Sequence, residues 1–203
     1  MIGADAMLYS HKPDIVATRP TSPIVTLASA KAALLIASDD ASMDGDVGDA
    51  LDKALDTVGG YLGIALMNLA VVDYYSRISA GTQLVLSRGG GEQISVTQSL
   101  NGTDWTTINA SQYISDPTRD PLVLTMLPAY TPPVWSEYIA YPVRVSYTVP
   151  AITSHEHIGT LREVVKTYVR VARQTDAEGN LLPGGERLAF QQIKPLLPAL
   201  SAL

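Results

Sequence analysis

Two short stretches of the chain carry the side chains that could do chemistry, and the first is a histidine pair. His155, Glu156 and His157 stand in a row at the start of an expected helix. Helical positions i and i+2 point to different faces, unlike the i, i+4 histidines of a zinc-binding helix. Only His11 could add a third imidazole. We therefore expect an exposed helix start here and no metal site.

The second stretch is an acidic loop over residues 38–48. Its oxygen-bearing side chains and one glycine follow the spacing of the first positions of an EF-hand calcium loop; they are Asp40, Ser42, Asp44, Gly45 and Asp46. The twelfth position of such a loop needs a bidentate Glu, and here it is Leu51, part of an apolar stripe. We interpret the loop as a helix start, where Asp44, Asp46 and Asp49 complement the positive end of the helix dipole. Weak calcium binding stays open as the alternative.

No other pattern indicates catalysis or a cofactor. The run from Gly89 to Gly91 joins two expected strands, whereas phosphate-binding glycine loops lead into a helix. No serine stands in a G-x-S-x-G elbow, no carboxylate pair is placed for acid–base work, and the chain has no cysteine. We expect a protein that is not an enzyme.

The amino-acid composition excludes further classes of protein. The chain has 203 residues, 46% of them hydrophobic and 17% charged, which excludes wholesale disorder. Lys and Arg number 14 and Asp and Glu 20, so the net charge of 14 − 20 = −6 argues against a protein that coats nucleic acid. The apolar stretch 58–72 is shorter than the roughly 20 residues of a membrane span. The N-terminus does not read as a secretory signal, and the lack of cysteine fits a reducing compartment.

The order of periodic segments predicts an α+β fold. Helices are expected at about 27–37, with Thr26 as N-cap, at 47–62, ending at Gly63, and from about residue 155 to 175. The strands expected between the second and third helices lie near 64–75, 82–88, 92–100, 104–108, 111–115, 121–127 and 141–149.

This order divides the chain into four parts. We expect an extended N-terminal arm (1–23), a small helical bundle (24–63 and 155–175), a β-rich insertion (64–150) and a C-terminal docking tail (176–203). Each short helix has an apolar stripe that needs a partner. Leu51 and Leu55 of the second helix should therefore pack against Leu161, Val165 and Val169 of the last.

Two surfaces are candidate interfaces with other proteins. A basic line follows the last helix at i, i+4, i+8 and i+11, formed by Arg162, Lys166, Arg170 and Arg173. An acidic counter-surface on the second helix consists of Asp49, Asp52 and Asp56. Charge pairs of this kind steer docking between subunits.

The tail is the third candidate interface. Its apolar residues follow a polar linker and are expected to dock on another protein; they include Leu188, Phe190, Ile193, Leu196 and Leu197.

The motifs, taken in order, resemble the head–tail connector (adaptor) proteins of long-tailed bacteriophages. The resemblance covers roughly residues 24–175. It rests on Val25-Thr26-Leu27 with Lys31 and Leu34, Gly63-Ile64-Ala65-Leu66, Ile94-Ser95-Val96-Thr97 with the Asn101-Gly102 turn, Trp105 and Tyr113 to Asp116, Val143-Arg144-Val145-Ser146-Tyr147, and Leu161-Arg162 through Val169. Ser29 stands where the family usually has Glu, and Ile64 replaces the arginine of the turn.

The resemblance implies a virion protein of the neck, made in the host cytoplasm and without catalysis. Its members form a ring of about a dozen copies between the portal and a tail-side neck or tail terminator protein, and genome DNA passes through the lumen without specific binding. No membrane partner is implied. The alternative from a different class is a soluble ligand-binding or carbohydrate-binding β module with a helical appendage.

Overall fold

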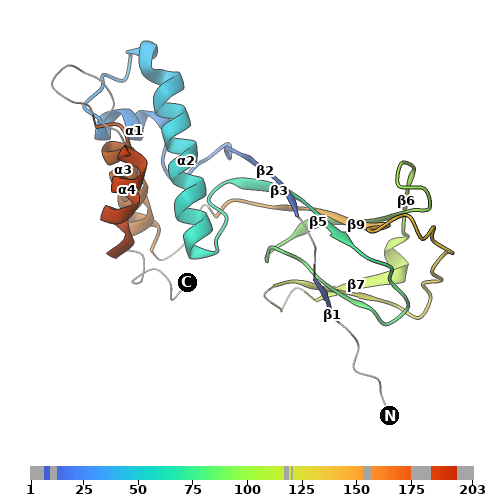
Figure 1. The fold of residues 1–203 in the computed structure, drawn as a ribbon. Helices are drawn as coiled ribbons and strands as arrows, with labels where there is room; N and C mark the ends of the chain where they lie inside the picture. Colours follow the sequence, from blue (N-terminus) through green and yellow to red (C-terminus); the bar gives the residue numbers. More distant parts are fainter. Residues whose placement is uncertain are drawn as a thin grey trace. The chain divides into compact units, whose positions relative to one another are not determined.

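The computed structural model describes residues 7–9, 13–116, 119, 121–152, 157–174 and 184–195, and the chain divides into two compact units (Figure 1). Residues 18–68 and 151–203 form the helical unit. Residues 1–17 and 69–150 form the strand unit. The predicted α+β class is confirmed.

Short helices make up the helical unit. They are α1 (Leu27–Ala33), the 3-10 turn η1 (Ala41–Met43), α2 (Asp44–Leu62), α3 (Ile158–Ala172) and α4 (Gly185–Ile193). Thr26 caps α1 as predicted, because its hydroxyl oxygen accepts a hydrogen bond from the backbone N–H of Ser29 at 3.2 Å. Gly63 ends α2 in the left-handed conformation, with φ of 72°, again as predicted.

The core of the helical unit lies where α2 packs against α3. Each of the side chains predicted to meet there is fully buried: Leu51, Leu55, Leu161, Val165 and Val169. Helix α2 starts three residues earlier than predicted, because η1 leads directly into Asp44 and the first turn forms within the acidic loop.

Helix α1 ends at Ala33 rather than at the predicted residue 37. The backbone N–H of Leu35 donates to the carbonyl of Ala32 at 3.1 Å, and that of Ile36 donates to the carbonyl of Lys31 at 3.0 Å. These are the two hydrogen bonds of a Schellman motif. This ending puts Leu35 in the left-handed region, with φ of 61°. A side chain there costs on the order of 1 kcal/mol, and Leu35 gains no burial in return, since 95% of it is exposed.

The strand unit contains two sheets. The four-stranded sheet has the order β1 (Met7–Tyr9), β4 (Gln83–Val85), β8 (Val123–Met126) and β7 (Tyr113–Asp116). The five-stranded sheet has the order β2 (Asp14–Thr18), β3 (Asn68–Tyr75), β9 (Val143–Val149), β5 (Glu92–Ser99) and β6 (Trp105–Thr107). Strands β1 and β2 come from the segment expected to be an extended arm, and each adds to the edge of a sheet, which supplies its backbone hydrogen bonds.

Buried polar groups join the two sheets. Asp73 of β3 is fully buried and accepts hydrogen bonds from the backbone N–H of Ser87 at 2.8 Å and from the hydroxyl of Tyr147 at 3.0 Å. The hydroxyl of Tyr75 donates to the carbonyl of Val85 at 2.7 Å. Burial raises the pKa of both tyrosines, so both stay neutral donors at physiological pH.

Helix α4 lies in the tail, whose apolar residues were expected to dock on another protein, and the structure corrects this expectation for part of them. It packs against α3, and its Ala189 and Ile193 are fully buried. Phe190 also contacts the ring of Tyr61 on α2, edge to face with centroids 5.6 Å apart. The buried side of α4 consists of Gly185, Ala189 and Ile193, at positions i, i+4 and i+8. The first two have small side chains, which allows α4 to pack closely. Leu196 and Leu197 lie outside the described residues.

The core assignment predicts a large loss of stability for Leu55→Ala. Deleting a fully buried leucine side chain leaves a cavity, so the free energy of unfolding should fall by about 2–5 kcal/mol in urea. Asp56→Ala, at the next and exposed position, is the control and should change it by no more than about 0.5 kcal/mol. Equal effects of the two substitutions would contradict the packing of α2 on α3.

The docking of α4 predicts that Gly185→Ala destabilises the chain. A Cβ atom at this position would lie 2.9 Å from the carbonyl oxygen of Ala172, and backbone cannot move aside cheaply. The expected loss is about 1–3 kcal/mol, measured by chemical unfolding. Gly159→Ala on α3 is the matched control, because a Cβ there meets nothing within 4 Å. If both variants are as stable as the parent chain, α4 does not rest on α3 in solution.

Candidate functional site

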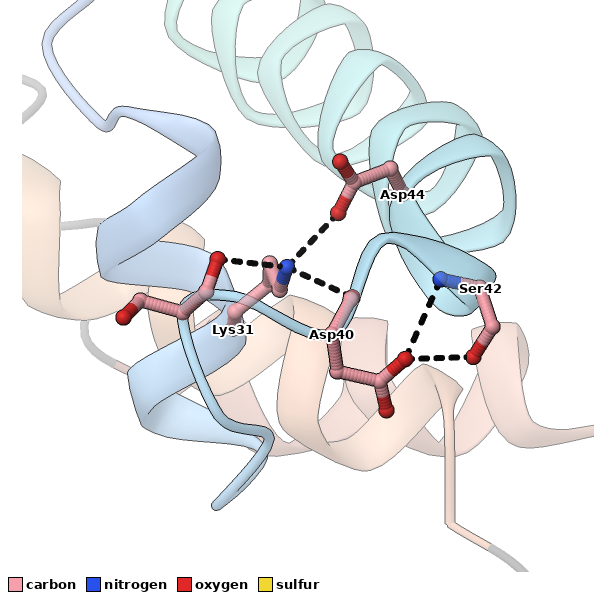
Figure 2. Close-up of polar contacts among 5 residues, drawn as sticks. Lys31, Asp40, Ser42 and Asp44 are labelled. Atoms are coloured by element: carbon pink, nitrogen blue, oxygen red, sulfur yellow. Dashed lines mark hydrogen bonds and ion pairs between the residues drawn. The ribbon is translucent and has the colours of Figure 1, made fainter.

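The acidic loop is organised around the buried ammonium group of Lys31 (Figure 2). Lys31 belongs to α1 and is 2% exposed. Its Nζ donates hydrogen bonds to the carbonyl oxygens of Ser38 at 3.0 Å and Asp40 at 2.7 Å, and to the carboxylate of Asp44 at 2.7 Å. These three contacts use all three donors of the ammonium group.

The loop therefore gathers its oxygens around a cation of its own chain. The carboxylate of Asp40 turns the other way and accepts hydrogen bonds from the backbone N–H of Ser42 at 3.1 Å and from its hydroxyl (Figure 2). These bonds lower the pKa of Asp40. Asp44 and Asp46 lie in the first turn of α2, as expected of a helix start, whereas Asp49 lies beyond that turn. Within the described ranges, no cluster of three or more His, Cys, Asp or Glu could hold a metal ion.

The basic line predicted on α3 is largely engaged within its own chain. Arg173 forms an ion pair with Asp46 at 2.9 Å, and Lys166 pairs with Glu163 at 2.9 Å. The Nε of Arg162 donates to the carbonyl oxygen of Ile24 at 2.9 Å. Arg170 is exposed and, among the residues that the structure describes, has no ion pair.

The acidic counter-surface on α2 is partly engaged as well. Asp52 pairs with Arg19 at 2.7 Å, and Arg19 also donates to the carbonyl of Gly48 at 2.9 Å. Asp49 and Asp56 are exposed and have no ion pair within the described part of the chain. Asp49, Asp52 and Asp56 are called the acidic face below.

The described part of the helical unit has hollows on its surface. A groove of about 310 Å³ lies between α1 and α3 and is called the basic groove below. Its lining includes Ser29, Ala32, Ala33, Glu163, Lys166 and Arg170. Another hollow, of about 500 Å³, lies among α2, α3 and α4, and its lining includes Lys53 and Glu186, which form an ion pair with atoms 2.6 Å apart. No histidine lines either hollow.

Comparison with known proteins gives structural neighbours and no sequence relatives. No protein-family model matches, and no curated protein matches. A chain of the neck of an empty gene transfer agent particle, computed with C6 symmetry, is similar with a TM-score of 0.56 and 14% identity, over 88% of this chain and 94% of that one. A chain of the virion of a native gene transfer agent particle is similar with a TM-score of 0.57 and 13% identity, over 89% and 93%.

Because their sequence identities are only 14% and 13%, these neighbours show a shared fold and nothing more specific. The coverage is high on both sides, so the match includes most of both units of this chain. In the part of the chain that the structure describes, no helix is long and apolar enough to cross a bilayer.

Sequence reasoning missed the two residues that organise this region. Lys31 enters the sequence prediction only as part of a family motif, although a lone charged residue among the alanines of a short helix is a signal that it needs partners. Arg19 lay in the expected arm, and nothing nearby in the sequence points to Asp52. Of the histidine cluster, His157 stands at the N-cap of α3, whereas His11, His155 and Glu156 lie outside the described residues.

The geometry of Lys31 predicts a strong effect for Lys31→Met. Methionine fills a similar volume but leaves two loop carbonyls and Asp44 without their donor, so unfolding in urea should be easier by about 2–4 kcal/mol. Asp44→Asn should cost less, about 1 kcal/mol or below, because the Asp44 side chain is 42% exposed and water can replace the lost charge pair. An unchanged stability of Lys31→Met would show that the loop does not depend on this cation.

Proposed function

We propose that this chain is a structural protein of the neck of a phage-like particle. The observation that carries the proposal is the shared fold, which spans 88–89% of this chain and 93–94% of chains from a gene transfer agent neck and virion. Because nearly the whole length of those chains is matched, the support does not rest on a small module that many unrelated proteins share.

Within the neck, the chain acts as the adaptor between the portal and the tail-side neck or tail terminator protein. The family resemblance of residues 24–175 supports this role. A ring of about a dozen copies is compatible with the C6 symmetry of one neighbour's neck, because twelve is a multiple of six.

The charge of the chain suits a conduit for DNA. With a net charge of −6 on each copy, a ring as a whole would repel phosphates rather than attract them, which favours passage of the genome without adhesion. The role is structural rather than catalytic, with assembly in the host cytoplasm and residence in the virion.

The tail is proposed to contact the portal or a neighbouring subunit of the ring, and the structure limits which of its residues are available for that contact. Leu188 of α4 is 44% exposed and available to a partner, whereas Ile193 is fully buried in its own chain. That contact is therefore assigned to the exposed side of α4 and to the segment that follows it.

The test is the assembly state of the purified chain. Native mass spectrometry and negative-stain microscopy should show closed rings whose mass corresponds to about twelve copies. The rings should not shift a double-stranded DNA fragment in a gel at physiological salt, because they do not neutralise phosphate charge. A chain that stays monomeric, alone and with the portal, would contradict the proposal, and specific binding of a sugar by that monomer would favour the alternative of a carbohydrate-binding module.

A further inference from the structure

We propose that copies of this chain join head to tail, with the basic groove of one copy receiving the acidic face of the next. The inference rests on the proposed ring and names the surface that closes it. The two surfaces share no residue: the groove is lined by α1 and α3, and the acidic face lies on α2. Two different surfaces on one chain make a heterologous contact, which closes into a ring when the rotation between copies allows it.

The charges left over after internal pairing favour a second copy as the occupant. At the groove, Lys166 is balanced by Glu163, and Arg170 has no ion pair among the described residues. On the acidic face, Asp52 is balanced by Arg19, and Asp49 and Asp56 have no ion pair in the same described ranges. The uncompensated charge is thus positive on one surface and negative on the other. Opposite potentials on two faces of one chain attract further copies and fix their register.

The shape of the groove fits the same partner. The residues that α1 contributes to its lining, Ser29, Ala32 and Ala33, have small side chains, which let a neighbouring helix approach closely. The outer face of a helix such as α2 is the kind of surface that such a groove receives.

Leu35, which does not line the groove but is close in sequence to residues that do, supplies an apolar anchor. It follows Ala33 by two residues, is 95% exposed and holds a left-handed backbone conformation that glycine would adopt without cost. A strained residue persists where the strain serves another purpose, and an exposed leucine at this corner gains burial only when another molecule covers it. We assign that cover to the neighbouring copy.

Charge reversal tests the contact. Arg170→Asp should raise the concentration needed for ring assembly by about tenfold or more, because it sets a carboxylate against Asp49 and Asp56. Asp49→Arg and Asp56→Arg should each do the same. Combining Arg170→Asp with one of the two aspartate reversals should restore assembly, since the joint then pairs opposite charges again. Glu137→Arg, the reversal of an exposed charge outside both surfaces, is the control and should assemble as the parent chain does.

A second measurement separates an interface from a folding effect. Leu35→Gly should raise the melting temperature of the free chain, because it relieves the backbone strain, and should at the same time weaken assembly. If Leu35 had a purely structural role, the melting temperature and the assembly of Leu35→Gly would change in the same direction.

The outcomes distinguish this inference from the proposed function. Rings of the parent chain with undiminished assembly of Arg170→Asp would overturn the head-to-tail contact and leave the neck role standing. Failure of both double variants to recover would overturn it too. If the parent chain forms no ring at all, the neck role and the contact fail together.

Discussion

Burying the ammonium group of Lys31 in the helical unit carries a free-energy cost that only nearby oxygen atoms can offset. The chain meets this requirement with two carbonyls of the α1–α2 connection and the carboxylate of Asp44. The position of α1, the path of the loop and the first turn of α2 are thereby fixed together. Helix α2 in turn offers Leu51 and Leu55 to α3, so the core of the helical unit depends on where this one cation sits.

The strand unit uses a buried anion in a similar way. Asp73 lies on β3 of one sheet, and the backbone that donates to it follows β4 of the other. Tyr147 on β9 completes the set. Because a buried polar group is costly when its partners are displaced, such a cluster permits one relative placement of the two sheets and penalises others. In each unit, a buried polar side chain, Lys31 or Asp73, therefore helps to fix how the surrounding elements pack.

Patterns local in the sequence were enough to predict α1, α2, α3 and the main core, but they did not predict the strands β1 and β2 or the helix α4. The apolar stripe of α2, the cap at Thr26 and the stop at Gly63 all depend on neighbours within one or two turns, and the structure has them as expected. What the sequence could not supply were partners distant along the chain. The pairs Arg173–Asp46 and Arg19–Asp52 neutralise charges that seemed free, and Ile193 finds its cover on α3. Periodicity shows that a face needs a partner and leaves its identity open.

The division of the helical unit between the two ends of the chain has a consequence for synthesis. The apolar stripe of α2 is complete at about residue 62, yet its partner α3 begins at Ile158. At 5–20 residues per second, the ribosome needs on the order of 5–20 s to supply α3, and during that interval Leu51 and Leu55 have no cover from it. The Lys31–Asp44 contact spans only 13 residues and can form at once. The contact between Lys31 and Asp44 can thus hold α1 and α2 together while the strand unit is synthesised, before α3 is available.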